Sequence, residues 1–211
     1  MNILELKRDL RAANKKRKAP YPDHMSMVPV WGPAARKLCR NLLGYSSRRR
    51  AWLHFHPLSF GQHVVEVAKA EVGTKEHPPG SNDGGRVHLY QKTTGAFRQP
   101  WCASFRMWCE QEAAKRMGRH LGWFTNPAWV PNWTAAFGGK LYAAVAFNDA
   151  QAGDVVTLWK SEHIETVVER QGDYLAGSGG NTSPVGQNAN GGMVARTRRH
   201  RSEVTKIGRR R

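Results

Sequence analysis

The sequence predicts an α+β fold in which N-terminal helices pack on a small antiparallel β-sheet. Apolar residues recur at helical spacing before residue 154, as at Val64, Val65, Val67 and Ala68. After Gly153 the pattern changes to short strand-like runs separated by glycine turns. The chain has 211 residues, of which 40% are apolar and 23% charged. This is enough for one sizeable domain with a small appendage, and it excludes global disorder.

Residues 1–58 are predicted to form a basic helical region. A partial apolar stripe, beginning with Ile3 and Leu4, indicates a helix over residues 1–18, which Pro20 and Pro22 end. A second helix is expected from Pro33, because proline after glycine is typical of a helix start. The sequence therefore separates an N-terminal region from the main domain, which we expect at residues 59–200, followed by a basic tail at 201–211.

The main domain is expected to contain helices first and strands afterwards. Helices are predicted over 63–72 and 101–117, a short helix or a turn over 87–91, and an aromatic-rich loop or short helices over 119–139. Strands are predicted over 154–159, 163–169 and 174–178, with a tight turn at 171–173, and a fourth strand is expected over 193–199. Consecutive strands of this kind form hairpins, so an antiparallel sheet is expected.

The charge is concentrated at the two ends of the chain. There are 33 Lys and Arg against 16 Asp and Glu, a net charge of +17. Residues 1–50 carry +10, residues 51–175 are neutral, and residues 176–211 carry +7. A neutral domain between basic ends indicates contact with a polyanion. Nucleic acid, anionic lipid head groups and anionic cell-wall polymers all fit this pattern.

Two locations are disfavoured by the sequence. No apolar run approaches the roughly 18 residues that a membrane helix needs, so no membrane span is expected. The first residues lack the apolar core and cleavage site of a secretory signal. We therefore expect synthesis in the cytoplasm without a signal peptide.

Cys102 is the strongest candidate for a nucleophile. The chain has three cysteines, too few for a disulfide framework. Cys102 falls in the first turn of the predicted helix 101–117, where the helix dipole and free backbone N–H groups favour a thiolate and can stabilise an oxyanion. Cys109 and Cys39 are interpreted as packing residues.

A cysteine that attacks an amide needs a histidine to exchange the proton and a third group to orient the imidazole. His163 begins a predicted strand, and Asn181 stands at the end of the next strand. A hairpin would bring these two strands together, and packing of the helix on the sheet would bring Cys102 to them. The order Cys102, His163, Asn181 is therefore physically coherent.

Four segments together resemble the CHAP amidohydrolases, cysteine enzymes of the papain-like superfamily that include bacteriophage lysins. They are GSNDGGRVHLY, PWCASFRMWC, AGDVVTLW followed by HIETVVE, and YLAGSGGNTS. The resemblance implies a papain-like fold and a peptidoglycan hydrolase, either an N-acetylmuramoyl-L-alanine amidase or an endopeptidase. It implies Cys102 as the nucleophile, His163 as the base and Asn181 as the orienting residue, with no metal and no cofactor.

The chain departs from this pattern at two positions. Many relatives carry a glutamate two places before the asparagine, where this chain has Gly179, and a small residue where it has Glu165. Glu165 shares a strand face with His163, because side chains alternate along a strand. Two interpretations stay open: Glu165 supplies the missing carboxylate as an accessory site residue, or it faces solvent.

Several residues are candidates for substrate contact. Asn82 and Asp83 lie in a polar loop and either bind a peptide or form the turn, and Trp101 directly precedes the nucleophile. Three further tryptophans either form a platform for sugar or peptide or belong to the core: Trp123, Trp129 and Trp133. The pair His54 and His56 has no nearby third ligand, so a metal site is not expected there.

The expected partners follow from these features. Peptidoglycan is the substrate implied by the resemblance, and residues 28–45 are similar to the second half of a small peptidoglycan-binding repeat. Anionic wall polymers would bind the basic ends. The protein would act on the wall after release from the host cell or as part of a virion. A non-catalytic papain-like scaffold that grips nucleic acid or wall polymers through its basic ends is the alternative.

Overall fold

The computed structural model describes residues 58–184 and 190–211. Within it, Ser59–Arg211 form one compact unit. The helices predicted at 1–18 and after Pro33, the thiol of Cys39 and the His54–His56 pair all lie outside the described residues.

Among the described residues, four α-helices precede or flank the sheet, and their starts follow local sequence signals. They are α4 (Phe60–Ala70), α5 (Gly85–Gln91), α6 (Cys102–Arg116) and α7 (Val130–Ala136). Ser59 caps α4 in a reciprocal capping box with Gln62. The apolar face of α4 packs against α6, with Val64, Val67 and Phe105 in one buried cluster.

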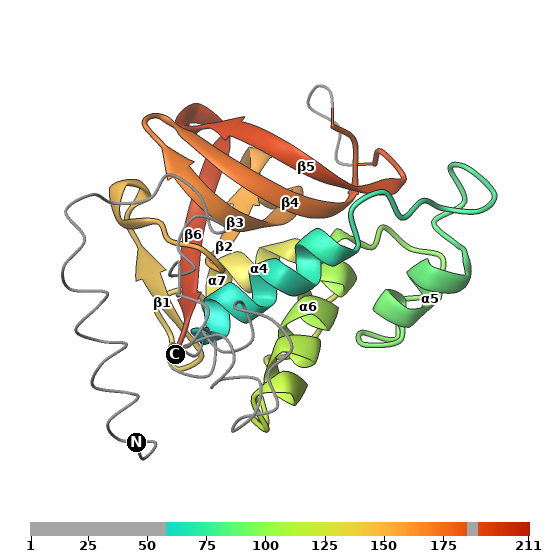
Figure 1. Ribbon diagram of the computed structural model, residues 1–211, viewed down its shortest axis with the longest axis horizontal. Coiled ribbons are helices and arrows are strands. Elements are labelled where there is room, and N and C mark those ends of the chain that lie inside the picture. The colour runs from blue at the N-terminus through green and yellow to red at the C-terminus, as the bar shows by residue number, and fades with distance from the viewer. Residues whose placement is uncertain (1–57, 185–189) are drawn as a thin grey trace, which may run out of the picture. The chain divides into compact units, whose positions relative to one another are not determined.

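Six strands form one antiparallel sheet in the order β1-β6-β2-β3-β4-β5 (Figure 1). The strands are β1 (Tyr142–Val145), β2 (Val155–Leu158), β3 (His163–Gln171), β4 (Tyr174–Thr182), β5 (Met193–His200) and β6 (Val204–Arg210). Every neighbouring pair is antiparallel. The fold class is therefore α+β, as predicted.

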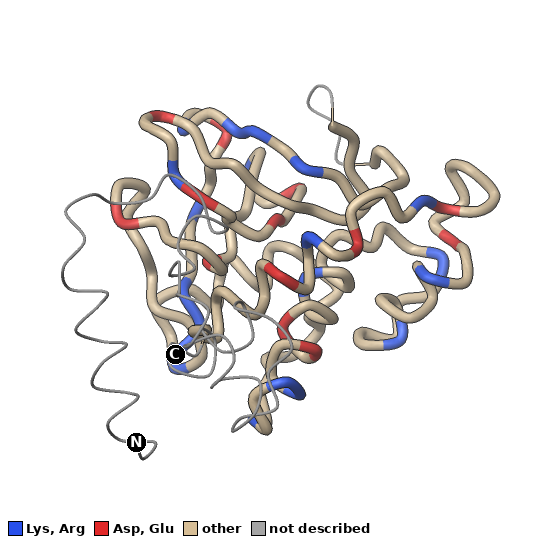
Figure 2. Tube along the Cα trace, in the orientation of Figure 1, with Lys and Arg blue, Asp and Glu red and all other residues tan. Residues whose placement is uncertain are grey.

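The C-terminal residues differ from the prediction of a basic tail at 201–211. After the 3₁₀ turn Arg201–Glu203, they form β6, which lies inside the sheet between β1 and β2. Figure 2 marks the basic positions along β5 and β6. Arg209 pairs with Asp154 at 2.8 Å and Arg210 with Glu110 at 3.0 Å. The arginines made the strand hard to predict from the sequence. Their aliphatic stems cover apolar surface, and their charges pair with acidic residues of the domain.

A buried arginine fixes α6 to the sheet. Arg106 is 1% exposed and donates to Thr166 on β3 at 2.8 Å, to Glu110 at 2.7 Å and to the carbonyl oxygen of Gly153 at 2.9 Å. Arg106 lies one turn after Cys102, and Thr166 lies three residues after His163. The clamp therefore sets the position of the cysteine helix relative to the histidine strand.

Two glycines allow the start of α4 to pack directly on the turn before β2. A Cβ atom built at Gly153 would lie 2.1 Å from the Cα atom of Gly61, and Gly153 has a φ angle of +91°. Gly172 also has a positive φ angle, +62°, but a Cβ atom built on it would have no atom within 4 Å. A side chain at either glycine would strain the backbone, but only at Gly153 would it also clash with a neighbouring atom. Comparing the two positions therefore distinguishes the clash from the strain.

We predict that Gly153→Ala destabilises the protein more than Gly172→Ala. Backbone strain costs about 1 kcal/mol at either site, and overpacking at Gly153 adds about 2 kcal/mol. Urea unfolding of both variants measures the difference in unfolding free energy. Equal losses would show that the close approach of α4 to the turn does not constrain the fold.

Candidate active site

Cys102 is the first residue of α6 and lies at the edge of a groove. Its side chain is nearly buried, with 5% of the residue exposed. The N-cap residue Trp101 makes no side-chain hydrogen bond to the first turn. The backbone N–H groups at this end of the helix are therefore not capped by Trp101, and the helix dipole favours negative charge there.

His163 is the first residue of β3 and is brought beside Cys102. A four-residue connection joins β2 to β3, so that Leu158 pairs with His163 in the ladder. The imidazole is fully buried. Burial alone lowers the pKa of His163, but the interactions with the Cys102 thiol and the Glu165 carboxylate outweigh burial and raise it to about 9. This arrangement favours an imidazolium next to the sulfur.

Glu165 faces the same way as His163 and is 1% exposed, so the interpretation that it faces solvent is wrong. Its Oε1 atom lies 3.4 Å from Nε2 of His163. Oε1 also accepts hydrogen bonds from Arg199, at 2.8 and 3.1 Å, and Oε2 accepts one from Thr197 at 2.5 Å. Burial opposes ionisation, but His163 and Arg199 hold the pKa of Glu165 at about 2.

The glycines of β4 make the space that Glu165 occupies. A Cβ atom at Gly179 would lie 2.8 Å from Cγ of Glu165, and one at Gly177 would lie 2.8 Å from its Oε2. At Gly180 the same atom would instead meet Phe105 and Trp101, at 2.6 and 2.7 Å. Neighbouring residues of a strand point to opposite faces. The glycines therefore admit Glu165 on one face and α6 on the other.

Asn181 is fully buried, but its hydrogen bonds go to loops. Its amide nitrogen donates to Oδ1 of Asn82 at 3.3 Å and to Oδ1 of Asn190 at 2.8 Å, and its Oδ1 accepts from the backbone of Gly192 at 3.3 Å. Within the described residues no hydrogen bond joins Asn181 to His163, and the carboxylate beside the imidazole is that of Glu165. Asn181 instead joins the loop between α4 and α5 to the loop between β4 and β5.

The predicted substrate contacts at Asn82, Asp83 and Trp101 have structural partners. The backbone carbonyl of Asn82 accepts from Gln91, and Asp83 accepts from its neighbour Gly84 and from Arg98. Trp101 is fully buried, and its indole N–H donates to Glu76 at 2.8 Å. Substrate contact by Trp101 is therefore wrong, because its ring belongs to the core beneath α6.

The groove beside Cys102 has a volume of about 580 Å³. Its walls come from the segment before α6, from the residues around the start of α7 and from the β2–β3 connection. Trp129 lines it and is 59% exposed, whereas Trp133 is fully buried and Trp123 packs against the core. The lining includes Gln99, Pro100, Asn126, Pro131, Lys160 and Glu162.

The β2–β3 connection has an unusual backbone. Trp159, Lys160 and Ser161 have φ angles of +49°, +58° and +74°, a conformation that residues with side chains rarely adopt. This backbone presents Lys160 and Glu162 to the groove and stacks the Trp159 ring on His163, with centroids 5.6 Å apart. Strained segments of this kind are common at functional sites.

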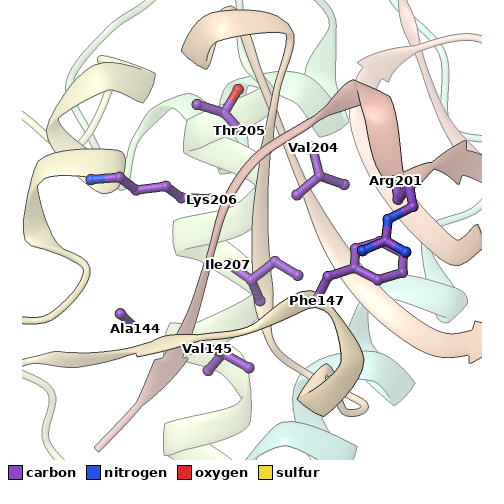
Figure 3. A pocket seen from close by; sticks show the side chains of 8 residues that line it. All are labelled: Ala144, Val145, Phe147, Arg201, Val204, Thr205, Lys206 and Ile207. Carbon is purple, nitrogen blue, oxygen red and sulfur yellow. The ribbon is translucent and has the colours of Figure 1, made fainter. Parts of the chain in front are cut away.

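A second hollow, of about 400 Å³, lies beside β1 and β6. Figure 3 shows its apolar side chains, among them Phe147 and Ile207, with Arg201 and Lys206 around them. Its lining contains no cysteine, histidine or carboxylate. The hollow therefore lacks the groups that amide hydrolysis by a thiol requires.

Residues 58–184 and 190–211 contain neither a cluster of metal ligands nor a membrane-spanning helix. No group of three or more histidine, cysteine or acidic side chains there could hold a metal ion. None of the helices in these ranges is both long enough and apolar enough to cross a bilayer.

Two residues of the site were not anticipated from the sequence. Trp159 stacks on the imidazole, and Arg199 binds the carboxylate beside it. The alternation of β5 holds a signal for Arg199, because this residue shares a strand face with Thr197, two residues before it. That alternation predicts that Arg199 and Thr197 share a face of β5. The structure shows in addition that both side chains donate to Glu165.

Comparisons with known proteins supply little further information. No protein-family model matches the chain, and no curated protein matches it. The chain is similar to a solved structure described as "The crystal structure of Ly7917", with 17% identity and a TM-score of 0.41. The match covers 72% of this chain and 62% of that one, so the chain spans less than two thirds of that protein.

We predict that iodoacetamide labels Cys102 in the folded protein and leaves Cys109 unmodified. Cys102 reaches the groove, whereas Cys109 is fully buried and burial raises the pKa of its thiol. Peptide mass spectrometry after a brief reaction at neutral pH measures labelling at each thiol, and denatured protein provides the control in which both react. Equal protection of both thiols in the folded protein would contradict an accessible nucleophile.

Proposed function

We propose that the protein is a cysteine amidohydrolase that cleaves an amide bond in the peptide portion of bacterial peptidoglycan. The observation that carries this proposal is a buried His163 that interacts electrostatically with Cys102, at the start of a helix, and lies 3.4 Å from the carboxylate of Glu165. This combination supplies a nucleophile, a proton carrier and an orienting carboxylate, the three roles that acyl transfer by a thiol needs.

The reaction begins with the thiolate of Cys102 and the imidazolium of His163. The sulfur attacks the carbonyl carbon of the scissile amide, and the carbonyl oxygen becomes an oxyanion. Backbone N–H groups in the first turn of α6 stabilise this oxyanion, assisted by the helix dipole. His163 then donates its proton to the leaving amine, and a thioester remains on Cys102.

Hydrolysis of the thioester completes the cycle. Neutral His163 takes a proton from water, which attacks the thioester carbonyl and releases the acid product. Glu165 stabilises the imidazolium and fixes its orientation through both steps. The Arg199 and Thr197 hydrogen bonds hold that carboxylate in place.

The groove supports a peptide-like substrate. It places the exposed ring of Trp129 and the charged side chains of Lys160 and Glu162 close to the nucleophile. Such a mixture can contact both the backbone and the charged groups of a short peptide. Peptidoglycan as the particular substrate comes from the resemblance to CHAP enzymes, and with it a papain-like arrangement and a role in wall lysis from a host cell or a virion.

Glu165 also accounts for the departure from the CHAP pattern. A glutamate common at position 179 in relatives is replaced by glycine here, and the side chain of Glu165 fills the space above that glycine. A carboxylate is thus retained at the imidazole although it comes from β3 instead of β4. This exchange supports assignment of the orienting role to Glu165.

We predict that purified protein clears a suspension of peptidoglycan and that Cys102→Ala does not. Glu165→Gln should lose about 100-fold or more of the clearing rate, because the neutral amide stabilises the imidazolium poorly. Cys109→Ala, on the same helix, is the matched control and should retain activity. Iodoacetamide should block clearing, and chelators should not.

Equal clearing by wild-type protein and Cys102→Ala would overturn the proposal. If both are inert while the protein retains DNA on a column, the alternative of a non-catalytic, nucleic-acid-binding scaffold gains the support instead. Mass spectrometry of the released fragments identifies which amide is cut.

A further inference from the structure

Arg199 is a buried charge that the reaction steps above use only to hold Glu165 in place. It lies on β5, the edge strand next to β4, and is 4% exposed. Its guanidinium donates two hydrogen bonds to Oε1 of Glu165, at 2.8 and 3.1 Å, and a third to Thr182 at 3.2 Å. It also lies 4.8 Å from the centre of the Trp159 ring, which stacks on His163. Arg199 is therefore built into the site.

Four ionisable groups form a chain of contacts inside the protein: Arg199, Glu165, His163 and Cys102. None of the four residues is more than 5% exposed. A net charge is costly in such surroundings, because little water is present to solvate it. With Arg199 and His163 positive and Glu165 negative, the four charges sum to zero only when the sulfur is a thiolate. Without Arg199, the remaining three sum to zero only when the sulfur is protonated.

Other charged groups near these four have partners of their own. Arg106 and Glu110 of α6 pair with each other at 2.7 Å. Glu76, in the segment after α4, accepts the indole N–H of Trp101. Lys160 and Glu162, in the β2–β3 connection, are both exposed to the groove, and water screens their opposite charges. The balance beside the sulfur thus depends on the four groups in contact.

We propose that Arg199 is a positioning residue that supplies the countercharge for the thiolate of Cys102, acting through Glu165 and His163. This inference rests on the proposed function and assigns a role to a residue of β5. Arg199 ties Glu165 in place and completes a neutral set of buried charges around a charged nucleophile.

The test measures how the rate of Cys102 alkylation by iodoacetamide depends on pH. Arg199→Met should raise the pH of half-maximal alkylation by about 1 unit and slow the reaction about tenfold at pH values below that midpoint. Arg199→Lys keeps the charge and should restore the wild-type midpoint at least in part. Arg198→Met is the matched control: Arg198 is the preceding residue of β5, is exposed and lies over the Tyr174 ring.

Glu165→Gln distinguishes charge balance from a general loosening of the site. Removing this negative charge should lower the alkylation midpoint, whereas Arg199→Met raises it. Loosening alone would move both variants in the same direction, and that result would overturn the proposal. So would a midpoint for Arg199→Met equal to that of wild type. If Arg199→Met does not fold, as judged by circular dichroism, the midpoints of Arg199→Lys and Glu165→Gln decide: the proposal requires the first near wild type and the second below it.

Failure of the inference can be told apart from failure of the proposed function. If wild-type protein clears peptidoglycan, Cys102→Ala does not, and the Arg199 variants have the wild-type midpoint, only the role of Arg199 is wrong. If Cys102→Ala clears as well as wild type, the proposed function is wrong whatever the alkylation profile.

Discussion

The pairing of His163 with Glu165 inside the sheet is the interaction on which the site depends. Two ionised side chains that are both less than 2% exposed lose most of their hydration, a cost of several kcal/mol for each ion. Hydrogen bonds from Arg199 and Thr197 offset the lost hydration of the carboxylate. The carboxylate and the adjacent sulfur offset that of the imidazolium. Because the pKa of His163 rises to about 9 in the folded protein, this pairing stabilises the fold fully below about pH 6.5 and less as the pH rises through 9.

The packing of β4 and of α6 against β3 holds His163 and Glu165 in position. The glycines of β4 leave room for Glu165, since a side chain at Gly177 or Gly179 would occupy its place. The clamp between Arg106 and Thr166 holds α6 against β3, so that the start of the helix meets the start of the strand. Backbone N–H groups, sulfur and imidazole are thereby brought together without any of them lying on a free loop.

Local patterns predicted much of this arrangement. The glycine-bounded helix at 101–117 and the alternation around His163 indicated α6 and β3, and the period of two placed Glu165 on the face of His163. Strand β6 was missed because arginines interrupt its alternation and their partners are distant in the sequence. Asn181 was expected beside His163, but side-chain direction at the end of a bulged strand pair depends on tertiary contacts. The alternation of β5 indicated that Arg199 shares a face with Thr197, but its pairing with Glu165 on β3 depends on tertiary contacts.

The ionisation state of His163 in the folded protein tests the account most directly. Nitrogen-15 NMR of the imidazole, with Cys102→Ala as the comparison, follows loss of its proton. We predict that the ring stays protonated through neutral pH, titrates near pH 9 in the wild-type protein, and titrates at lower pH once the sulfur is removed. A wild-type ring that is already neutral at pH 6.5, as burial alone would make it, would contradict the coupling of Glu165, His163 and Cys102.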